Sequence, residues 1–433
     1  MNTDTRGRSR IRSAAMWLLL LELRIPLITL IITYSISVLG LVLIPGVTPE
    51  GVVYHLSFLD AFYLVSYTAT TIGFGEIPHP FTPSQKLWML FVMYSTVIAW
   101  LYSIGSILAV LSDPAFRHLR SYQRSVSRIH GIKYPYWVVC GYGAAGSQLI
   151  RFLDQSGVRC VMIDSNVNRA DAARLSDLSY ELDILVGDAA EPQTLVDAGV
   201  QRALCRGVLA LTDQDQVNLT VSTNTRILAP RVPVYARSAT DANTRNLRSF
   251  DTEFVVDPFR VASRSVTQLI QKPYAFALYH ELVDPDLNQI EAVEIPSSGH
   301  WIICAAGRMA ETMVEAFSRE QIPFCLVSAR APGARGDWPW IQGIGTEAQT
   351  LRKARIGDAV GIIAGTNDDG DNLSILLTAQ SENPNLVTVA RRNRSTSEPV
   401  FGQGHFSFVL REGRIIAQEL YARITTPLLH QFL

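Results

Sequence analysis

Thr68-Ala69-Thr70-Thr71-Ile72-Gly73-Phe74-Gly75-Glu76 is the stretch that decides the fold, because two long uncharged apolar runs flank it. Inside a membrane a backbone carbonyl has no water partner, so an extended segment there needs something for its carbonyls to bind. Gly73 and Gly75 can adopt a positive φ, which lets alternate peptides turn their carbonyls to one side. Four such segments around one axis would form stacked oxygen rings that replace the hydration shell of K⁺, with Thr71 hydroxyls at the inner end.

The five residues Thr71-Ile72-Gly73-Phe74-Gly75 resemble the Thr-Val-Gly-Tyr-Gly selectivity filter of potassium channels. The resemblance implies K⁺ sites at Thr71, Ile72, Gly73 and Phe74. Ile72 is a conservative replacement, but Phe74 lacks the tyrosine hydroxyl that would brace the filter from behind. A weakly selective cation channel is therefore the alternative. One chain carries one filter segment and an axial site needs four, which implies a homotetramer.

The two uncharged runs, Ile25–Ile44 and Leu87–Leu111, are each long enough to cross a bilayer. A single Arg or Asp at mid-membrane costs about 2.5–3.5 kcal/mol, so the absence of charge is informative. Leu56–Thr70 is apolar but too short to cross, which predicts a re-entrant pore helix. Ile11–Leu23 predicts a helix at the inner interface. Arginines lie before the first run and after the second, which predicts a multi-pass protein of the cell membrane with both termini in the cytoplasm.

The same resemblance gives expectations for residues around the filter. Tyr63 and Tyr67 lie one turn apart on the expected pore helix, where aromatic residues brace the filter. Glu76 takes the place of an acid that follows the filter in the family, and one hypothesis is a Tyr67–Glu76 hydrogen bond. Gly105 is the only glycine in the second run, so either it is the bending point or that helix bends little.

The totals narrow the class of protein. The chain has 433 residues, which accommodates about three domain-sized units. A formal net charge of −1 gives no general attraction for nucleic acid, and no nucleic-acid partner is expected. Five scattered cysteines without a Cys-x-x-Cys spacing argue against a zinc site or a disulfide framework.

A glycine motif follows the short apolar run at 136–140. Gly141-Tyr142-Gly143-Ala144-Ala145-Gly146 lies between a predicted strand and a helical pattern, the setting that gives Gly-x-Gly-x-x-Gly its meaning. The first glycine makes the turn, the second lets a pyrophosphate approach, and the third lets the helix pack on the sheet. Asp164 ends the next predicted strand, where its carboxylate would hold ribose hydroxyls and favour NAD over NADP.

Strands that alternate with helices indicate a doubly wound parallel sheet, whose strand ends meet at one edge. The predicted nucleotide site consists of the glycine loop and the residues at these strand ends: Gly141, Gly143, Ala144, Ala145, Gly146, Asp164, Ser165, Asp188, Ala189, Thr212 and Arg237. The expected ligand is NAD, with ADP or ATP as the alternative. A Rossmann sheet with an empty or structural crevice is the other interpretation.

Residues 134–290 resemble the RCK domain (regulator of K⁺ conductance, also called KTN), and the unit follows a two-helix pore as it does in that family. The resemblance implies that Asp164 and the three motif glycines contact an adenine nucleotide. Phe254–Pro258 and the helix that follows to Gln271 resemble the crossover segment that pairs neighbouring RCK domains. The small C-terminal lobe is expected to be shortened to about 273–297.

The chain then repeats itself. Trp137-Val138-Val139-Cys140 returns as Trp301-Ile302-Ile303-Cys304, an offset of 164, and Ala236-Arg237 returns as Ala390-Arg391, an offset of 154. The repeat predicts a second RCK-like unit. It has lost the positions that would handle phosphate and ribose, by the replacements Gly141 to Ala305, Gly146 to Ala310, Asp164 to Ser328 and Asp188 to Ile344. We predict that this unit is mainly structural or binds something else.

Acidic loop residues leave a role for Ca²⁺ open. Asp368, Asp369 and Asp371 cluster in the second unit, and Asp213 and Asp215 lie together in the first. Carboxylates are the ligands that Ca²⁺ prefers, but solvated loop acids are the more common interpretation of such clusters.

The predicted fold class is a membrane α-helical pore, with two transmembrane helices and a re-entrant pore helix, fused to two tandem Rossmann-like α/β RCK domains. The expected divisions are an N-terminal cytoplasmic or interfacial segment, the pore domain, a linker, the nucleotide-binding RCK domain and the degenerate RCK domain, at 1–24, 25–115, 116–133, 134–297 and 298–433.

The expected function is a homotetrameric K⁺-selective channel, not an enzyme. Eight RCK units would form a cytoplasmic ring, and ligands bound to it would pull on the inner helices through 117–133. A membrane-anchored NAD-dependent dehydrogenase would explain the glycine motif but not the filter, and the sequence offers no plausible His/Asp or Lys catalytic set.

Overall fold

The structure is a computed structural model that describes residues 4–112, 114–284, 295–296, 299–331 and 338–426. The chain forms two compact parts, 1–124 and 125–433, and each is described by itself.

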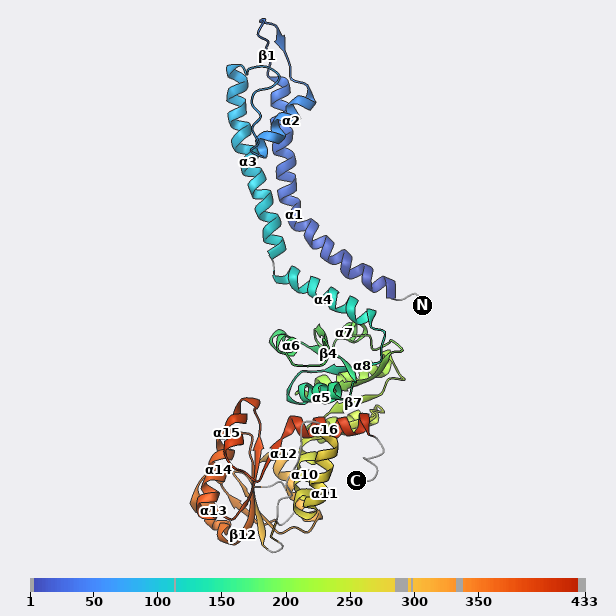
Figure 1. Cartoon of the computed structure of the whole chain (residues 1–433), viewed down its shortest axis with the longest axis vertical. Coiled ribbons are helices and arrows are strands. Elements are labelled where there is room, and N and C mark those ends of the chain that lie inside the picture. Colours follow the sequence, from blue (N-terminus) through green and yellow to red (C-terminus); the bar gives the residue numbers. More distant parts are fainter. Residues whose placement is uncertain (1–3, 113, 285–294, 297–298, 332–337, 427–433) are drawn as a thin grey trace. The chain divides into compact units, whose positions relative to one another are not determined.

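The first part is built from two long helices that pack along each other, α1 (Asp4–Leu43) and α3 (Pro83–Ser112). Within them, Leu23–Leu43 and Pro83–Ala109 are long and apolar enough to cross a membrane. The expected helix at 11–23 is part of α1, which continues through it without interruption (Figure 1). Gly40 allows the close packing, because a Cβ there would lie 2.1 Å from the Trp88 ring.

A short helix and a small hairpin connect these two helices. The helix α2 (Phe58–Ala69) is the expected pore helix, and the Ser57 side chain caps it by accepting a hydrogen bond from the Asp60 N–H. Before it, β1 (Gly46–Val47) and β2 (Val53–Tyr54) form an antiparallel pair that the sequence did not predict. After α3 in the chain comes the basic helix α4 (Pro114–Gly131), within which the first part ends and the second begins.

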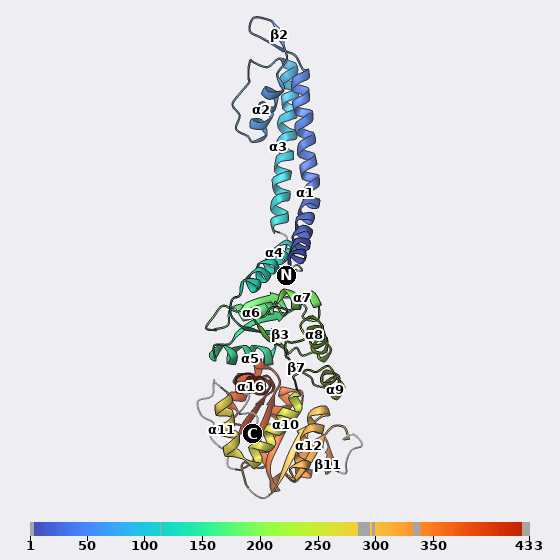
Figure 2. The same cartoon turned by 90° about the vertical axis from the view of Figure 1, so that its right-hand side faces the viewer.

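The second part contains two six-stranded sheets, and within each sheet the strands run parallel (Figure 2). The first sheet has the order β5-β4-β3-β6-β7-β8, with strands β3 (Tyr136–Cys140), β4 (Arg159–Asp164), β5 (Asp183–Val186), β6 (Cys205–Ala210), β7 (Val234–Arg237) and β8 (Phe254–Val256). Its helices are α5 (Ala144–Gln155), α6 (Val167–Arg174), α7 (Pro192–Asp197), α8 (Asp215–Leu228) and α9 (Asp241–Ser249). The strand order reverses between the adjacent strands β3 and β6, which is where this type of sheet binds ligands.

The second sheet repeats this order as β11-β10-β9-β12-β13-β14. Its strands are β9 (His300–Ala305), β10 (Phe324–Ser328), β11 (Trp340–Gln342), β12 (Ala359–Gly365), β13 (Val387–Arg392) and β14 (Phe408–Arg411). Its helices are α12 (Gly307–Arg319), α13 (Ala348–Lys353), α14 (Asp369–Glu382) and α15 (Glu398–Gln403).

The helices that leave the two sheets are exchanged between them. Helix α10 (Pro258–Gln271) leaves the first sheet and packs on α12 of the second, while α16 (Glu412–Thr425) leaves the second and packs on α5 of the first. Helix α11 (Pro273–Val283) covers α10 and α16, and part of the expected lobe at 273–297 lies outside the described residues.

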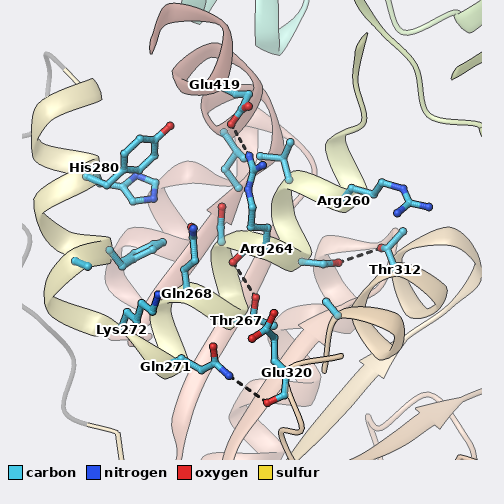
Figure 3. A pocket seen from close by; sticks show the side chains of 18 of the residues that line it. Arg260, Arg264, Thr267, Gln268, Gln271, Lys272, His280, Thr312, Glu320 and Glu419 are labelled. Atoms are coloured by element: carbon cyan, nitrogen blue, oxygen red, sulfur yellow. Dashed lines mark hydrogen bonds and ion pairs between the residues drawn. The ribbon is translucent and has the colours of Figure 1, made fainter. Parts of the chain in front are cut away.

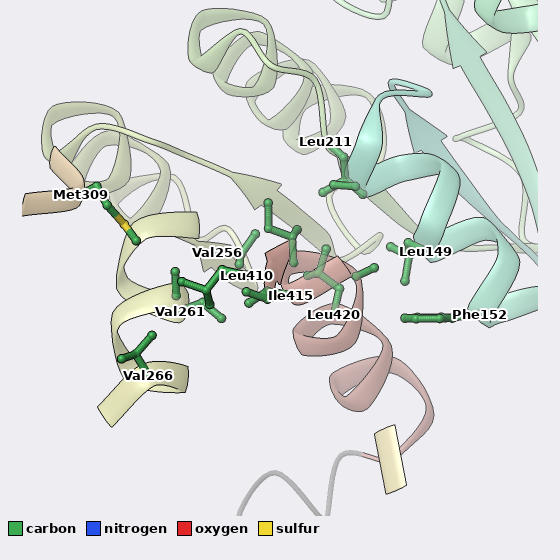
Figure 4. Close-up of a cluster of buried hydrophobic side chains, with 14 of the residues drawn as sticks. Leu149, Phe152, Leu211, Val256, Val261, Val266, Met309, Leu410, Ile415 and Leu420 are labelled. Carbon is green, nitrogen blue, oxygen red and sulfur yellow. The ribbon is translucent and has the colours of Figure 1, made fainter. Parts of the chain in front are cut away.

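One continuous hydrophobic core follows from this exchange. It joins Leu149 and Phe152 of α5 to Leu420 of α16, and Val266 of α10 to Met309 of α12 (Figure 4). All five side chains are buried. Because the core is shared, the two sheets form one folded body rather than two independent domains.

Gly413 tests the contact between α16 and α5. A Cβ at Gly413 would lie 2.6 Å from the Ala144 carbonyl carbon and oxygen, and backbone atoms cannot turn away. We expect Gly413→Ala to destabilise the part of the chain that contains the two sheets by about 1–3 kcal/mol, the usual effect of overpacking. Thermal unfolding of the purified full chain should show a lower Tm, whereas Gly402→Ala, which meets nothing within 4 Å, should leave it unchanged or slightly raised. Equal Tm values for the two variants would contradict this packing.

Candidate functional site

The filter segment has an alternating backbone. Thr71, Gly73 and Gly75 have φ angles of 62°, 67° and 105°, and a positive φ is uncommon for a residue such as threonine. A Cβ at either glycine would meet nothing within 4 Å, so the backbone angle, not crowding, requires glycine there. This alternation is the backbone geometry that can point successive carbonyls toward one side.

Phe74 packs behind the segment against the pore helix. Its ring is stacked on Tyr63, with centroids 6.4 Å apart, and meets Tyr67 edge-on at 5.6 Å. The Tyr67 hydroxyl donates to the Gly75 carbonyl oxygen. The hypothesis of a Tyr67–Glu76 hydrogen bond is wrong, because the Glu76 carboxylate turns away to accept the Phe81 N–H at 2.7 Å. A hydroxyl braces the segment, but it comes from the helix rather than from the filter.

Apolar side chains of the segment lack cover within one chain. Ile72 is 59% exposed and Phe74 is 66% exposed, although both lie in the connection between two helices that are long and apolar enough to cross a membrane. Exposed apolar surface of this kind marks a contact with another chain or with lipid.

The glycine loop has the geometry that the motif predicts. Gly141 has a φ of 102°, and its N–H donates to the Ile163 carbonyl. A Cβ at Gly146 would lie 1.9 Å from the Gly141 oxygen, so the third glycine is needed for close packing. Gly143 caps α5 without a side-chain hydrogen bond, which leaves the amides of the first turn open to an anion.

Asp164 fixes the same loop. Its side chain is nearly buried, and its two oxygens accept the N–H groups of Tyr142 at 2.7 Å and Asn166 at 2.8 Å. Each carboxylate oxygen keeps a second lone pair, so ribose hydroxyls can still donate to it. Arg169 of α6 lies 3.8 Å from Asp164 and 3.7 Å from Asp213, and the sequence analysis missed it. Its position in the first turn after β4 was the available signal.

The other predicted site residues differ in what they can contribute. Asp188 accepts the Ala190 N–H at 2.9 Å, and Thr212 is tied to Asn218 through both its N–H and its hydroxyl. Ser165 is exposed beside Asp164, whereas the Ala189 side chain is buried. The Gly187 N–H donates to the Asp164 carbonyl, so the ends of β4 and β5 do meet.

Arg237, at the end of β7, is already engaged. Its Nη2 lies 2.8 Å from Glu412 of α16 and its Nη1 lies 3.9 Å from Asp215. Glu412 also accepts from Arg391 at 3.2 Å. Burial alone would raise the pKa of Glu412, but the guanidiniums of Arg237 and Arg391 outweigh it and lower that pKa.

In the second unit, an arginine occupies the equivalent helix terminus and pairs with acids of the first unit. Arg308 stands where the first unit has Ala144, and its Nη2 donates to Asp241 and Asp257 at 2.6 Å each. Asp257 also caps α10 by accepting two backbone N–H groups. The hydrogen bond from Arg308 lowers the pKa of Asp241, and the same bond raises that of Arg308.

The acidic clusters serve the backbone. Asp368 caps α14, and Asp369 accepts the Asn393 N–H and the Ser397 hydroxyl at 2.7 Å each. Asp215 likewise accepts the Ala239 and Thr240 N–H groups. Within the part of the chain that the structure describes, no three His, Cys, Asp or Glu residues are arranged to hold a metal ion.

A cavity of about 570 Å³ lies between α10, α11, α12 and α16 (Figure 3). Arg264 crosses it to the nearly buried Glu419, and Gln271 donates to the Glu320 carbonyl. None of the predicted site residues lines this cavity.

Arg202 anchors the end of the linker helix to the first sheet. It donates from Nη1 to the Ile129 carbonyl at 2.7 Å and from Nη2 to the Ile132 carbonyl at 2.8 Å. Ile129 is fully buried, so the C-terminal turn of α4 moves with this sheet.

Comparisons with known proteins agree with this geometry. Residues 137–258 and 301–411 match the TrkA-N domain, and residues 27–113 match the ion channel family. Potassium channel protein 1 of Methanocaldococcus jannaschii is 25% identical over 57% of this chain and 72% of its own length. The voltage-gated potassium channel Kch of Escherichia coli is 25% identical over 49% and 50%.

Solved structures match nearly the whole chain. The GsuK channel bound to ADP is 20% identical, covers 95% of this chain and 100% of its own, and has a TM-score of 0.55. GsuK bound to NAD is 19% identical, covers 95% and 84%, and has a TM-score of 0.52. The predicted fold class is confirmed. Among the first curated relatives, the chain spans from 35% to 72% of the relative's length.

Arg308 tests the ion-paired terminus in the second unit. Arg308→Gln removes charged hydrogen bonds to Asp241 and Asp257, and we expect a loss of about 1.5–3 kcal/mol in the free energy of unfolding at neutral pH. The stabilisation that comes from Asp241 is fully present above the pKa of its unfolded carboxyl, about 3.9. It is lost as the pH falls through the lower pKa of this carboxyl in the folded state. The difference from wild type should therefore be constant between about pH 7 and 5 and narrow below about pH 4.

Thermal or denaturant unfolding across this pH range is the measurement. Arg319→Gln is the matched control, because Arg319 is an exposed arginine on the same helix with an exposed partner, Glu315. It should change stability by less than about 0.5 kcal/mol. A loss in Arg308→Gln no greater than in this control would contradict the structural role of Arg308.

Proposed function

Because this chain belongs to the TrkA-N domain family and carries an ion-channel domain ahead of its two TrkA-N units, we propose that it is a K⁺-selective channel gated by a cytoplasmic nucleotide. The observation that carries the proposal is the Thr71–Gly75 segment, with positive φ at alternate residues, between two helices able to span a membrane. Permeant K⁺ would bind the backbone oxygens of Thr71, Ile72, Gly73 and Phe74.

The assembly we propose is a homotetramer in the cell membrane, with both termini in the cytoplasm. Four copies of the segment are needed to surround an axial ion, and the exposure of Ile72 and Phe74 supports contact with a neighbouring chain. Two TrkA-N units per chain would then give eight in the ring. The named relatives are potassium channels, which does not favour the dehydrogenase alternative.

The ligand we propose for the first unit is NAD or ADP. Support comes from the open N-terminus of α5, the positive φ at Gly141 and the carboxylate of Asp164 at the end of β4. Structures of GsuK with ADP and with NAD exist, and their fold is similar to this one. Ligand-driven movement of the first sheet would reach the pore through α4, whose end Arg202 holds.

Ion flux tests the pore. Full-length protein in K⁺-loaded vesicles should pass K⁺ far faster than Na⁺. Gly73→Ala should abolish this preference, because an L-residue is strained at a φ of 67°. Gly51→Ala introduces the same kind of strain at a φ of 84°, in the turn between β1 and β2, and should keep selectivity. Equal K⁺ and Na⁺ fluxes in wild type would favour the weakly selective alternative, and no flux of either would overturn the pore.

Calorimetry tests the nucleotide site. Asp164→Ala should weaken NAD binding by about tenfold or more, since a hydrogen bond to a charged group contributes about 1.5–3 kcal/mol. Asp251→Ala removes an exposed acid paired with Arg226 in the same unit and should not change the affinity. Identical affinities for wild type and the folded Asp164 variant would remove Asp164 from the site.

A further inference from the structure

Glu412 connects the two sheets through matching residues. It is the first residue of α16, and its carboxylate lies 2.8 Å from Arg237 and 3.2 Å from Arg391. These arginines are equivalent in the sequence repeat, and they lie on β7 and β13, the fifth strand of each unit along the chain. A single acid of the second unit therefore bridges the same position in both.

The bridge lies at the edge of the predicted nucleotide site. Gly413, next to Glu412, is so close to Ala144 that a Cβ would lie 2.6 Å from its carbonyl. The first turns of α5 and α16 therefore touch, and each brings unpaired N–H groups and a positive dipole end. Arg237 adds a nearly buried guanidinium whose Nη1 makes no hydrogen bond to any described residue. Asp215 lies 3.9 Å from this nitrogen, and Glu412, between Arg237 and the two helix ends, occupies a position suited to an anionic group.

A phosphate and a carboxylate compete for arginine by the same chemistry. Both offer oxygen acceptors that match the guanidinium fork. In a doubly wound sheet the phosphates lie at the N-terminus of the first helix, and the second half of a dinucleotide lies beyond the reversal of strand order, toward β6 and β7. Because Gly413 contacts Ala144, a phosphate bound at the N-terminus of α5 would lie near the ion pair between Glu412 and Arg237.

Resting on the nucleotide function proposed above, we propose that Glu412 is an internal competitor for nucleotide phosphate at Arg237. When phosphate binds Arg237, Glu412 keeps only Arg391, and one of the ion pairs that join the two units opens. Nucleotide occupancy and the contact between the units are thereby coupled, because a ligand shifts such an equilibrium only through unequal affinity for its two states. The second unit lacks this exchange, since Arg308 and Asp257 close its equivalent terminus.

The test compares ADP with adenosine by calorimetry on the full-length protein. Glu412→Gln frees Arg237 and should tighten ADP binding by at least about fivefold, the low end of typical coupling. Arg391→Gln leaves Glu412 to Arg237 alone and should weaken ADP binding. Adenosine, which has no phosphate, should bind all variants equally. Glu382→Gln is the matched control. Glu382 is another glutamate of the second unit, it ends α14, and it accepts hydrogen bonds from Arg352 of α13.

The outcomes separate this inference from the nucleotide function itself. If wild type binds neither ADP nor NAD, the nucleotide site fails and the competition fails with it. If ADP binds but Glu412→Gln leaves its affinity unchanged, or shifts adenosine equally, the competition is overturned while the site stands. Damage to folding would weaken binding in both variants, so the opposite signs expected for Glu412→Gln and Arg391→Gln distinguish competition from a general structural effect.

Discussion

The need of each backbone carbonyl for a partner is the constraint on which this molecule depends. Helices α1 and α3 satisfy their own carbonyls, but the segment Thr71–Gly75 between them is not helical. Its alternating positive φ and its uncovered Ile72 and Phe74 belong to a chain that is incomplete alone. In the proposed assembly, neighbouring chains and a permeant ion would supply the missing partners for both features, and the proposed ring would provide control.

The two TrkA-N units show how one scaffold reaches two electrostatic solutions. A helix N-terminus in a parallel sheet is a site of unpaired N–H groups and positive potential, and something negative must face it. The first unit keeps small residues there and leaves the terminus of α5 open to a ligand. The second unit places Arg308 at its terminus, and Asp241 and Asp257 of the first unit neutralise it. The loss of Gly141 and Asp164 equivalents is therefore accompanied by a gain of ion pairs.

Features fixed by local chemistry were predictable from the sequence, and contacts between distant segments were not. The order of strands and helices and the turn at Gly141 follow from patterning and from backbone angles. The partner of Tyr67 was predicted wrongly, because a one-residue difference between Gly75 and Glu76 decides which oxygen the hydroxyl reaches. The pairing of Arg237 with Glu412 joins residues 175 positions apart, and only the exchange of α10 and α16 brings them together.

This exchange also determines how a small event can become mechanical. A ligand that perturbs one loop on a flexible sheet dissipates its effect locally, but here a shared core prevents either sheet from deforming independently. The ion pairs of Glu412 lie across the contact between the sheets, so a ligand that competes for Arg237 would act on both sheets together. Arg202 binds the last turn of α4 next to the first sheet, and α4 is continuous from Pro114 to Gly131. In the proposed tetramer, a coupling of about 1–3 kcal/mol at each of four sites would add up, which is enough to shift a pore between closed and open populations.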